Sequence, residues 1–312
     1  MSAISPSIDA NHAKARIDAL AGAVGQIILG KEETIRLAVT TLLARGHLLF
    51  EDLPGVGKTT LAQSLARTLG LQFRRVQFTS DLLPADIIGA SIFDKTTSSF
   101  VFKPGPLFTQ VLLADEINRA TPKTQSALLE AMEEGQVSAD GESHQLPSPF
   151  FVIATQNPIS SSGTFHLPES QLDRFLMRLQ LGKPGREAER ALLMGEDRRE
   201  LLAGLQAVLS PGELVSLQAL ARNVHASPAL LDYVQDLLDA SRQHGHGLSP
   251  RAGLAILAAA RAWALSQGRT MVVPEDIQAT APFVIAHRLD HCVEGTSGAD
   301  LARLVLETTA VP

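Results

Sequence analysis

The segment that most constrains the fold is the glycine-rich turn Asp52–Thr59 (DLPGVGKT). An apolar stretch, 47–50, precedes this turn, and a helical pattern, 59–69, follows it. A strand, a glycine-rich turn and a helix in this order are typical of a phosphate-binding loop, because the backbone N–H groups and the helix N-terminus then converge on phosphate oxygens. The turn therefore predicts a nucleotide-binding α/β domain.

Side chains in this turn have distinct predicted roles. We expect the ammonium group of Lys58 to reach the β- and γ-phosphates of ATP, and the hydroxyl of Thr59 to ligate Mg²⁺. The general pattern opens with glycine, whereas this chain has Asp52 there, which leaves the ligating groups in place. The residues of this segment predicted to bind the nucleotide are Asp52, Pro54, Gly55, Val56, Gly57, Lys58, Thr59 and Thr60.

Short apolar segments alternate with helical ones in the first part of the chain. With 47–50, the segments 73–78, 110–114, 150–154 and 175–181 predict five strands of a parallel sheet. After Lys183 the pattern becomes helical, and Ser227-Pro228 and Ser249-Pro250 are typical helix starts. We therefore predict an α/β domain at 1–184 and an all-helical domain at 185–312.

Two acids, Asp115 and Glu116, follow the apolar segment 111–114. A carboxylate at the end of a strand beside a phosphate-binding loop can hold Mg²⁺, and we assign this role to Asp115. Glu116 is then the candidate general base, which takes a proton from the attacking water. An Asp-Glu pair alone is more often an exposed strand end, but its place after Lys58 favours the catalytic interpretation.

Polar residues also follow the apolar segment 150–154. The amide of Asn157 could hold the attacking water or the γ-phosphate between the two preceding sites, and Thr155 is the alternative. Asparagine before Pro158 is equally typical of an ordinary turn. The sequence alone leaves both interpretations of Asn157 open.

Three arginines are candidates for stabilising charge on the γ-phosphate. Arg174 could reach the nucleotide of a neighbouring subunit, and Arg178 is the alternative. An ion pair within the chain, for example with Asp173, explains Arg174 equally well. Arg251 lies in the first turn of a predicted helix, where a cation is unfavourable, so a phosphate partner would offset the mismatch.

Taken together, these residues resemble an AAA+ ATPase, with Walker A, Walker B, sensor 1, arginine finger and sensor 2 in order. The segments most similar to the MoxR family are 115–120, 123–132, 154–158 and 167–175. The resemblance implies hydrolysis of ATP to ADP and phosphate, a hexameric ring and a chaperone-like action on a protein partner, which could carry a von Willebrand factor A domain. It also implies an insert at about 82–108 and a hairpin at about 136–148, both facing the pore or the partner.

Charge and composition restrict the partners further. The chain has 27 Lys and Arg against 33 Asp and Glu, and the formal net charge of −6 gives no general attraction to nucleic acid. A motor like the MCM helicases would need basic pore hairpins, and 136–147 holds no Lys or Arg. A magnesium-chelatase-like motor subunit remains an alternative, and Glu116 argues against a switch without turnover. With the single cysteine Cys292 and no apolar run of about 20 residues, we predict a cytoplasmic protein without a transmembrane segment.

His287 and His291 are four residues apart, as metal ligands on a helix can be. No acid or cysteine completes a set on the same helix face. We therefore expect a solvated helix end here rather than a metal site.

Overall fold

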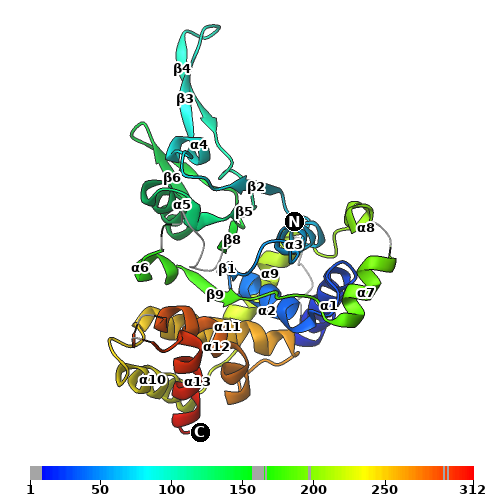
Figure 1. Cartoon of the computed structure of the whole chain (residues 1–312), viewed down its shortest axis with the longest axis vertical. Helices are drawn as coiled ribbons and strands as arrows, with labels where there is room; N and C mark the ends of the chain where they lie inside the picture. Colours follow the sequence, from blue (N-terminus) through cyan, green and yellow to red (C-terminus); the bar gives the residue numbers. More distant parts are fainter. Residues whose placement is uncertain (1–8, 157–164, 166, 196–197, 291, 294) are drawn as a thin grey trace, which may run out of the picture.

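The computed structural model describes residues 9–312 apart from 157–164, 166, 196–197, 291 and 294. Its centre is a five-stranded parallel sheet in the order β2-β5-β8-β1-β9 (Figure 1). The strands are β1 (His47–Glu51), β2 (Phe73–Gln77), β5 (Val111–Asp115), β8 (Phe151–Gln156) and β9 (Phe175–Leu179). This arrangement confirms the predicted α/β fold.

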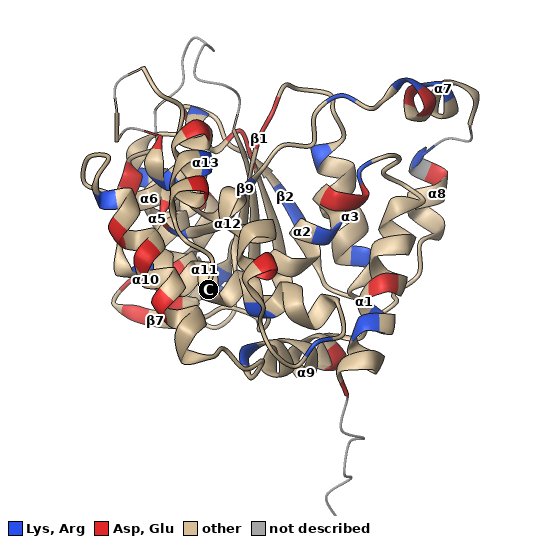
Figure 2. Ribbon diagram, turned by 90° about the horizontal axis from the view of Figure 1, so that it is seen from below, with Lys and Arg blue, Asp and Glu red and all other residues tan. Residues whose placement is uncertain are grey.

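In the inner strands of the sheet, alternate side chains enter two different cores. In β1, Leu48 and Phe50 face one core and Leu49 faces the other. The helices α1 (Ala10–Gly25), α2 (Glu32–Leu43) and α3 (Lys58–Thr68) belong to the first core, and α5 (Pro122–Glu134), after the short η1 (Ile117–Arg119), belongs to the second. Figure 2 shows the strands between these two groups of helices. Burial on both faces explains why β1, β5 and β8 read as apolar runs, whereas the edge strand β2 carries exposed arginines.

The helical part of the chain shares the first core. Its helix α11 packs against α1, α2 and α9, and α12 packs against strand β9. Serines 210, 227, 249 and 297 accept a backbone N–H in the first turn of α9, α10, α11 and α13. The helices are α7 (Arg186–Met194), α8 (Arg198–Gly204), α9 (Pro211–Arg222), α10 (Pro228–Arg242), α11 (Pro250–Ser266), α12 (Pro274–Leu289) and α13 (Gly298–Thr308).

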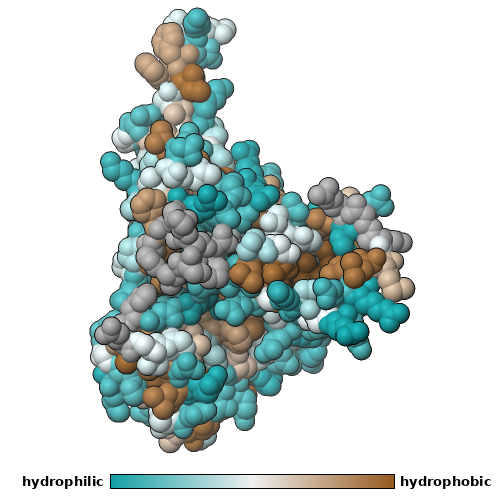
Figure 3. All heavy atoms as spheres, in the orientation of Figure 1, coloured by the Kyte–Doolittle hydropathy of each residue, from teal (hydrophilic) through white to brown (hydrophobic). Residues whose placement is uncertain are grey.

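Two hairpins leave the α/β part within the segments predicted as insert and hairpin. Strands β3 (Gly89–Asp94) and β4 (Ser99–Pro104) follow the short helix α4 (Pro84–Ile88) and extend far from the sheet (Figure 1). The turn that joins them, 95–98, is polar, but apolar side chains beside it are exposed, with Phe100 73% exposed (Figure 3). Strands β6 (Gln136–Ala139) and β7 (Glu142–Gln145) form the second hairpin. Phe102 and His144 stack with ring centroids 3.9 Å apart and so connect the two hairpins.

Candidate functional site

The carboxyl ends of the central strands meet at one edge of the sheet. The register pairs Glu51 of β1 with Gln156 of β8, and Gln77 of β2 with Asp115 of β5. A cavity of about 370 Å³, which we term the nucleotide cavity, lies at this edge. Its lining contains Pro54, Gly55, Gly57, Lys58, Thr59, Thr60, Arg75, Gln77, Asp115, Glu116 and Thr155.

The glycine-rich turn wraps around the ammonium group of Lys58. Its Nζ donates to the carbonyl oxygens of Asp52, at 2.7 Å, and Leu53, at 2.9 Å. Gly55 and Gly57 have φ angles of 84° and 101°, which side chains with a Cβ rarely adopt. Burial lowers the pKa of Lys58, and nearby carboxylates, that of Asp52 first, oppose this shift. The turn thus holds a cation at the N-terminus of α3, where phosphate oxygens are favoured.

The carboxylate of Asp52 points away from the nucleotide cavity. It accepts hydrogen bonds from the backbone N–H groups of Leu181 and Gly182, the latter at 2.9 Å. Asp52 therefore ties the phosphate-binding loop to the segment that leaves β9 for the helical part. The carboxylate is thus engaged by these two N–H groups, while the carbonyl oxygen of Asp52 accepts from Lys58, and nucleotide binding by Asp52 stays a prediction. Val56, predicted in the same set, packs its side chain against the first core.

The two acids after β5 have well-defined partners. Asp115 accepts a hydrogen bond from the hydroxyl of Thr155 at 2.6 Å and from both Nη2 and Nε of Arg75, at 2.5 and 3.0 Å. Glu116 accepts from Gln77 at 2.8 Å and from Arg119 at 3.0 Å. Its backbone is left-handed, with φ 56°, a conformation that is strained for a glutamate and is often found at functional sites.

Thr155, the alternative in the sequence analysis, connects the two acids. Its hydroxyl donates to Asp115 and accepts from the backbone N–H of Glu116 at 2.9 Å. Asn157 lies outside the described residues. Arg75 and Gln77 were not singled out from the sequence, although their alternation in β2, directly after the α3 segment, places them on one face and at the end of the neighbouring strand.

The oxygen atoms in the nucleotide cavity fit a bound Mg²⁺. The carboxylate of Asp115 and the hydroxyl of Thr59 both line it, together with the ammonium group of Lys58. Oxygen ligands from one or two side chains, completed by phosphate oxygens, are what Mg²⁺ prefers in proteins. The nucleotide cavity can thus accept a nucleoside triphosphate with its metal ion.

Arg174 and Arg251 lie together, outside the nucleotide cavity. Arg174 pairs with Glu133 at 2.5 Å and donates to the carbonyl oxygen of Leu129 at 2.6 Å. Arg251 pairs with Glu133 at 3.3 Å and with Asp173 at 3.8 Å. We term this cluster the arginine face; it lines a second cavity of about 310 Å³ beside Gly46 and His47, where β1 begins.

The sequence leaves open whether Arg251 binds the nucleotide of its own chain or that of a neighbour, and the position of the arginine face bears on this choice. The arginine face lies at the amino ends of β1 and β9, whereas the nucleotide cavity lies at the carboxyl ends of the strands. Helix α11 carries Arg251 to the arginine face because it packs against α2 and α9. Arg251 is thus separated from Lys58 by the length of the strands.

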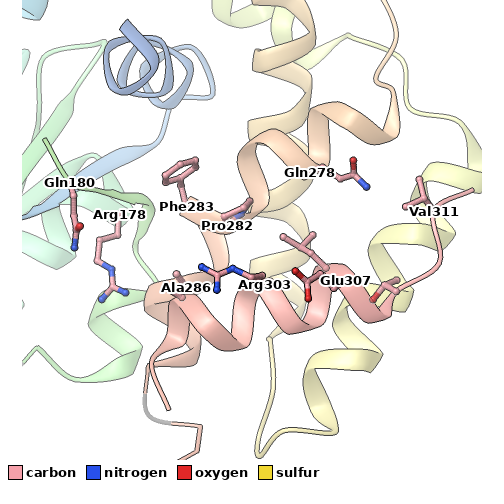
Figure 4. A pocket seen from close by; sticks show the side chains of 12 residues that line it. Arg178, Gln180, Gln278, Pro282, Phe283, Ala286, Arg303, Glu307 and Val311 are labelled. Atoms are coloured by element: carbon pink, nitrogen blue, oxygen red, sulfur yellow. The ribbon is translucent and has the colours of Figure 1, made fainter. Parts of the chain in front are cut away.

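Arg178, the alternative to Arg174, has two acidic partners within the chain. It pairs with Glu51 at 3.0 Å and with Asp290, and its side chain is 14% exposed. Figure 4 shows it at one end of a separate cavity of about 690 Å³ between β9 and helices α12 and α13, with Phe283 and Arg303. The two ion pairs join the end of β1 to the end of α12.

His287 is buried, so the expected solvated helix end is wrong. Its Nε2 lies 3.1 Å from the carbonyl oxygen of Phe175. Burial lowers the pKa of His287 well below its usual value, and the charges of Arg288 and Arg178 act in the same direction. Arg288, which the sequence did not single out, donates to Asp173 at 2.6 Å and fixes α12 to the start of β9. His291 lies outside the described residues.

Among the helices that the structure describes, none combines the length and apolar composition that crossing a bilayer requires. The one cysteine, Cys292, carries a free thiol. Its sulfur lies 3.6 Å from Nε2 of His246.

Known proteins match this chain in sequence and in structure. The model of the "ATPase family associated with various cellular activities (AAA)" matches residues 47–177, and the AAA lid domain matches residues 238–304. Protein YeaC of Bacillus subtilis is 43% identical over 93% of this chain and 92% of its own length. Chaperone MoxR1 of Mycobacterium tuberculosis is 41% identical over 93% of this chain and 80% of its own.

A provisionally assigned ATPase from Cytophaga hutchinsonii has a crystal structure that matches with a TM-score of 0.87 and 32% identity, over 97% of both chains. These matches cover both the α/β part and the helical part. They make the chain a nucleotide-binding ATPase. By its sequence, its lid and its fold, the chain belongs to the MoxR family of AAA ATPases.

Proposed function

We propose that this ATPase works as a hexameric ring in which each active site is shared by two subunits, and that it uses ATP hydrolysis to remodel a protein partner. The observation that carries the proposal is the separation of the nucleotide cavity from the arginine face. Lys58 and Glu116 lie on the first, and Arg174 and Arg251 lie on the second. Two such faces on one chain fit a head-to-tail ring.

Within one chain, the nucleotide cavity binds ATP and prepares water for attack. Lys58 and the N-terminus of α3 bind the phosphates. Asp115 and Thr59 would hold Mg²⁺, which when bound neutralises charge on the phosphate oxygens. Glu116 accepts the proton of the attacking water, and Gln77 and the hydroxyl of Thr155 hold the two acids in place.

The neighbouring subunit supplies positive charge to the reaction. On the arginine face, Arg174, Arg251 and Arg288 outnumber the two acids, Glu133 and Asp173. An anion from outside the chain would balance this excess. The γ-phosphate of a neighbour's ATP is such an anion, and its negative charge grows in the transition state, where a guanidinium group stabilises it most.

The partner is a protein in this proposal. The exposed tip of the β3–β4 hairpin presents Ile92, Phe93 and Phe100, which suit an apolar peptide segment rather than a phosphate backbone. The relative MoxR1 is named a chaperone. A partner with a von Willebrand factor A domain and a cytoplasmic setting remain predictions from the family resemblance and the sequence.

A mixing experiment tests the shared site. Arg174→Ala subunits, with an intact nucleotide cavity, are combined with Lys58→Ala subunits, whose Arg174 is intact. Each variant alone should be nearly inactive, and ATP hydrolysis should return on mixing, because some interfaces then join an intact cavity to an intact arginine. If mixed rings form, as seen by light scattering and tagged pull-down, and activity does not return, Arg174 acts within its own chain or is structural.

A further inference from the structure

The carboxylate of Glu133 lies between the two arginines and contacts both. Its Oε2 is 2.5 Å from Nη1 of Arg174, and its Oε1 is 3.3 Å from Nη1 of Arg251. The two arginines come from distant parts of the chain, one before β9 and the other in the lid helix α11. Two guanidinium groups this close repel each other unless an anion lies between them. Glu133 supplies that anion.

The backbone that carries Glu133 is held in place from two directions. His47, at the start of β1, lies with its Nε2 3.1 Å from the carbonyl oxygen of Met132, the residue before Glu133. Arg174 donates to the carbonyl oxygen of Leu129, one turn earlier in α5. These contacts hold the main chain of α5 at Glu133 against the start of β1 and beside Arg174.

We propose that Glu133 is a positioning residue that holds Arg174 and Arg251 as one pair, so that both reach a neighbour's γ-phosphate together. This inference rests on the proposed shared site. The side chains of Glu133 and Arg251 are 37% and 46% exposed. Ion pairs this exposed are only weakly stabilising, so the arginine pair can turn from the carboxylate to a phosphate without a large cost.

A double-mutant cycle tests whether the two arginines act as a pair. Hydrolysis of ATP by assembled rings is measured for Arg174→Ala, Arg251→Ala and the double variant, over hours so that slow variants remain measurable. With Glu133 intact, the fold loss of activity in the double variant should be about tenfold smaller than the product of the fold losses in the two single variants. In a Glu133→Gln background, which keeps the side chain's shape, this coupling should fall to within about twofold of none. Glu134→Gln, at the next position of α5, is the matched control and should keep the coupling.

The outcomes separate the two proposals. If the single variants lose activity but their coupling is the same with Glu133→Gln as in the parent, the role of Glu133 is refuted and the shared site stands. If neither arginine affects hydrolysis in assembled rings, both proposals fail. If Glu133→Gln does not yield folded rings, Glu133→Asp replaces it: its shorter charged side chain should weaken the coupling, and full coupling would refute the role.

Discussion

The nucleotide cavity and the arginine face both gather basic and acidic side chains, but they differ in how those side chains are held. Asp115 is 12% exposed and has fixed partners in Thr155 and Arg75. On the arginine face, Glu133 and Arg251 are far more exposed, and their contact is longer. The first region is suited to holding one geometry. The second is suited to exchanging its ion pairs for another anion.

The two regions differ in rigidity because different elements of the fold carry their side chains. The acids and the lysine of the nucleotide cavity directly follow strands, so the parallel sheet places them at one edge. The arginine face combines α5 and the turn before β9 with the lid helices α11 and α12, which reach it because the lid packs against α2 and β9. In the proposed ring, the first region binds ATP and activates the water, and the second stabilises the negative charge that develops on a neighbour's γ-phosphate.

The largest effect should come from Glu116→Gln in the nucleotide cavity. This change keeps the hydrogen bond from Gln77 but removes the base, so turnover should fall about 10²- to 10⁴-fold while ATP still binds. Phosphate release and the binding of a fluorescent ATP analogue measure the two properties. Turnover near the parent rate would assign the base to another residue and weaken the contrast between the two regions.

Lys58→Ala should weaken ATP binding by about 10²- to 4 × 10³-fold, because removing one member of a buried charge pair costs about 3–5 kcal/mol. Calorimetric titration with ATP gives the affinity directly. Arg174→Ala is the control from the arginine face, and it should bind ATP normally as an isolated subunit. Unchanged affinity of Lys58→Ala would remove the Walker A assignment.

His47 lies at the start of β1 beside the arginine face, and its burial should make the fold sensitive to acid. Its Nδ1 accepts the N–H of Val152 at 3.0 Å, so the neutral ring donates through Nε2 to Met132. Burial lowers the pKa of His47 to about 4, whereas the unfolded chain binds this proton near pH 6.5. The free energy of unfolding should therefore be intact above pH 6.5 and fall by up to ~3 kcal/mol as the pH drops to 4.

Denaturant unfolding at several pH values measures this loss. His287 should add a change in the same direction, because burial lowers its pKa as well. His47→Gln should remove the part of this pH dependence that protonation of His47 causes. An equally steep pH dependence in His47→Gln would show that the proton binds elsewhere.

The smallest effect should come from Asp52→Gly, which restores the general loop pattern. Lys58 is held by backbone carbonyl oxygens, so ATP binding should change less than about threefold, within the ~0.5–1.5 kcal/mol of one hydrogen bond. The loss should appear in the link from the loop to Leu181 and Gly182, as faster hydrogen exchange at these two amides. Unaltered hydrogen exchange at these amides would show that Asp52 does not link the phosphate-binding loop to the lid, and the contrast between the two regions would then be sharper.

The nucleotide cavity could be predicted well from the sequence, because its groups lie in short segments whose order fixes their place. Lys58, Thr59, Asp115 and Glu116 each follow a recognisable strand, and a parallel sheet brings strand ends together whatever the loops do. Arg75 and Gln77 could have been added from the alternation in β2. The hydrogen bonds of the Asp52 carboxylate could not be predicted, because its partners Leu181 and Gly182 are distant in sequence.

The sequence by itself determined the fold class, the phosphate-binding loop and the two acids, because each depends on local pattern and on the direction of neighbouring strands. Only the tertiary structure decided that Arg251 joins Arg174 rather than Lys58, that Glu133 lies between these arginines, and that His287 is buried. These outcomes depend on how the lid helices pack against α2 and β9. Packing is settled by the fit of whole apolar surfaces, which no single segment of the sequence encodes.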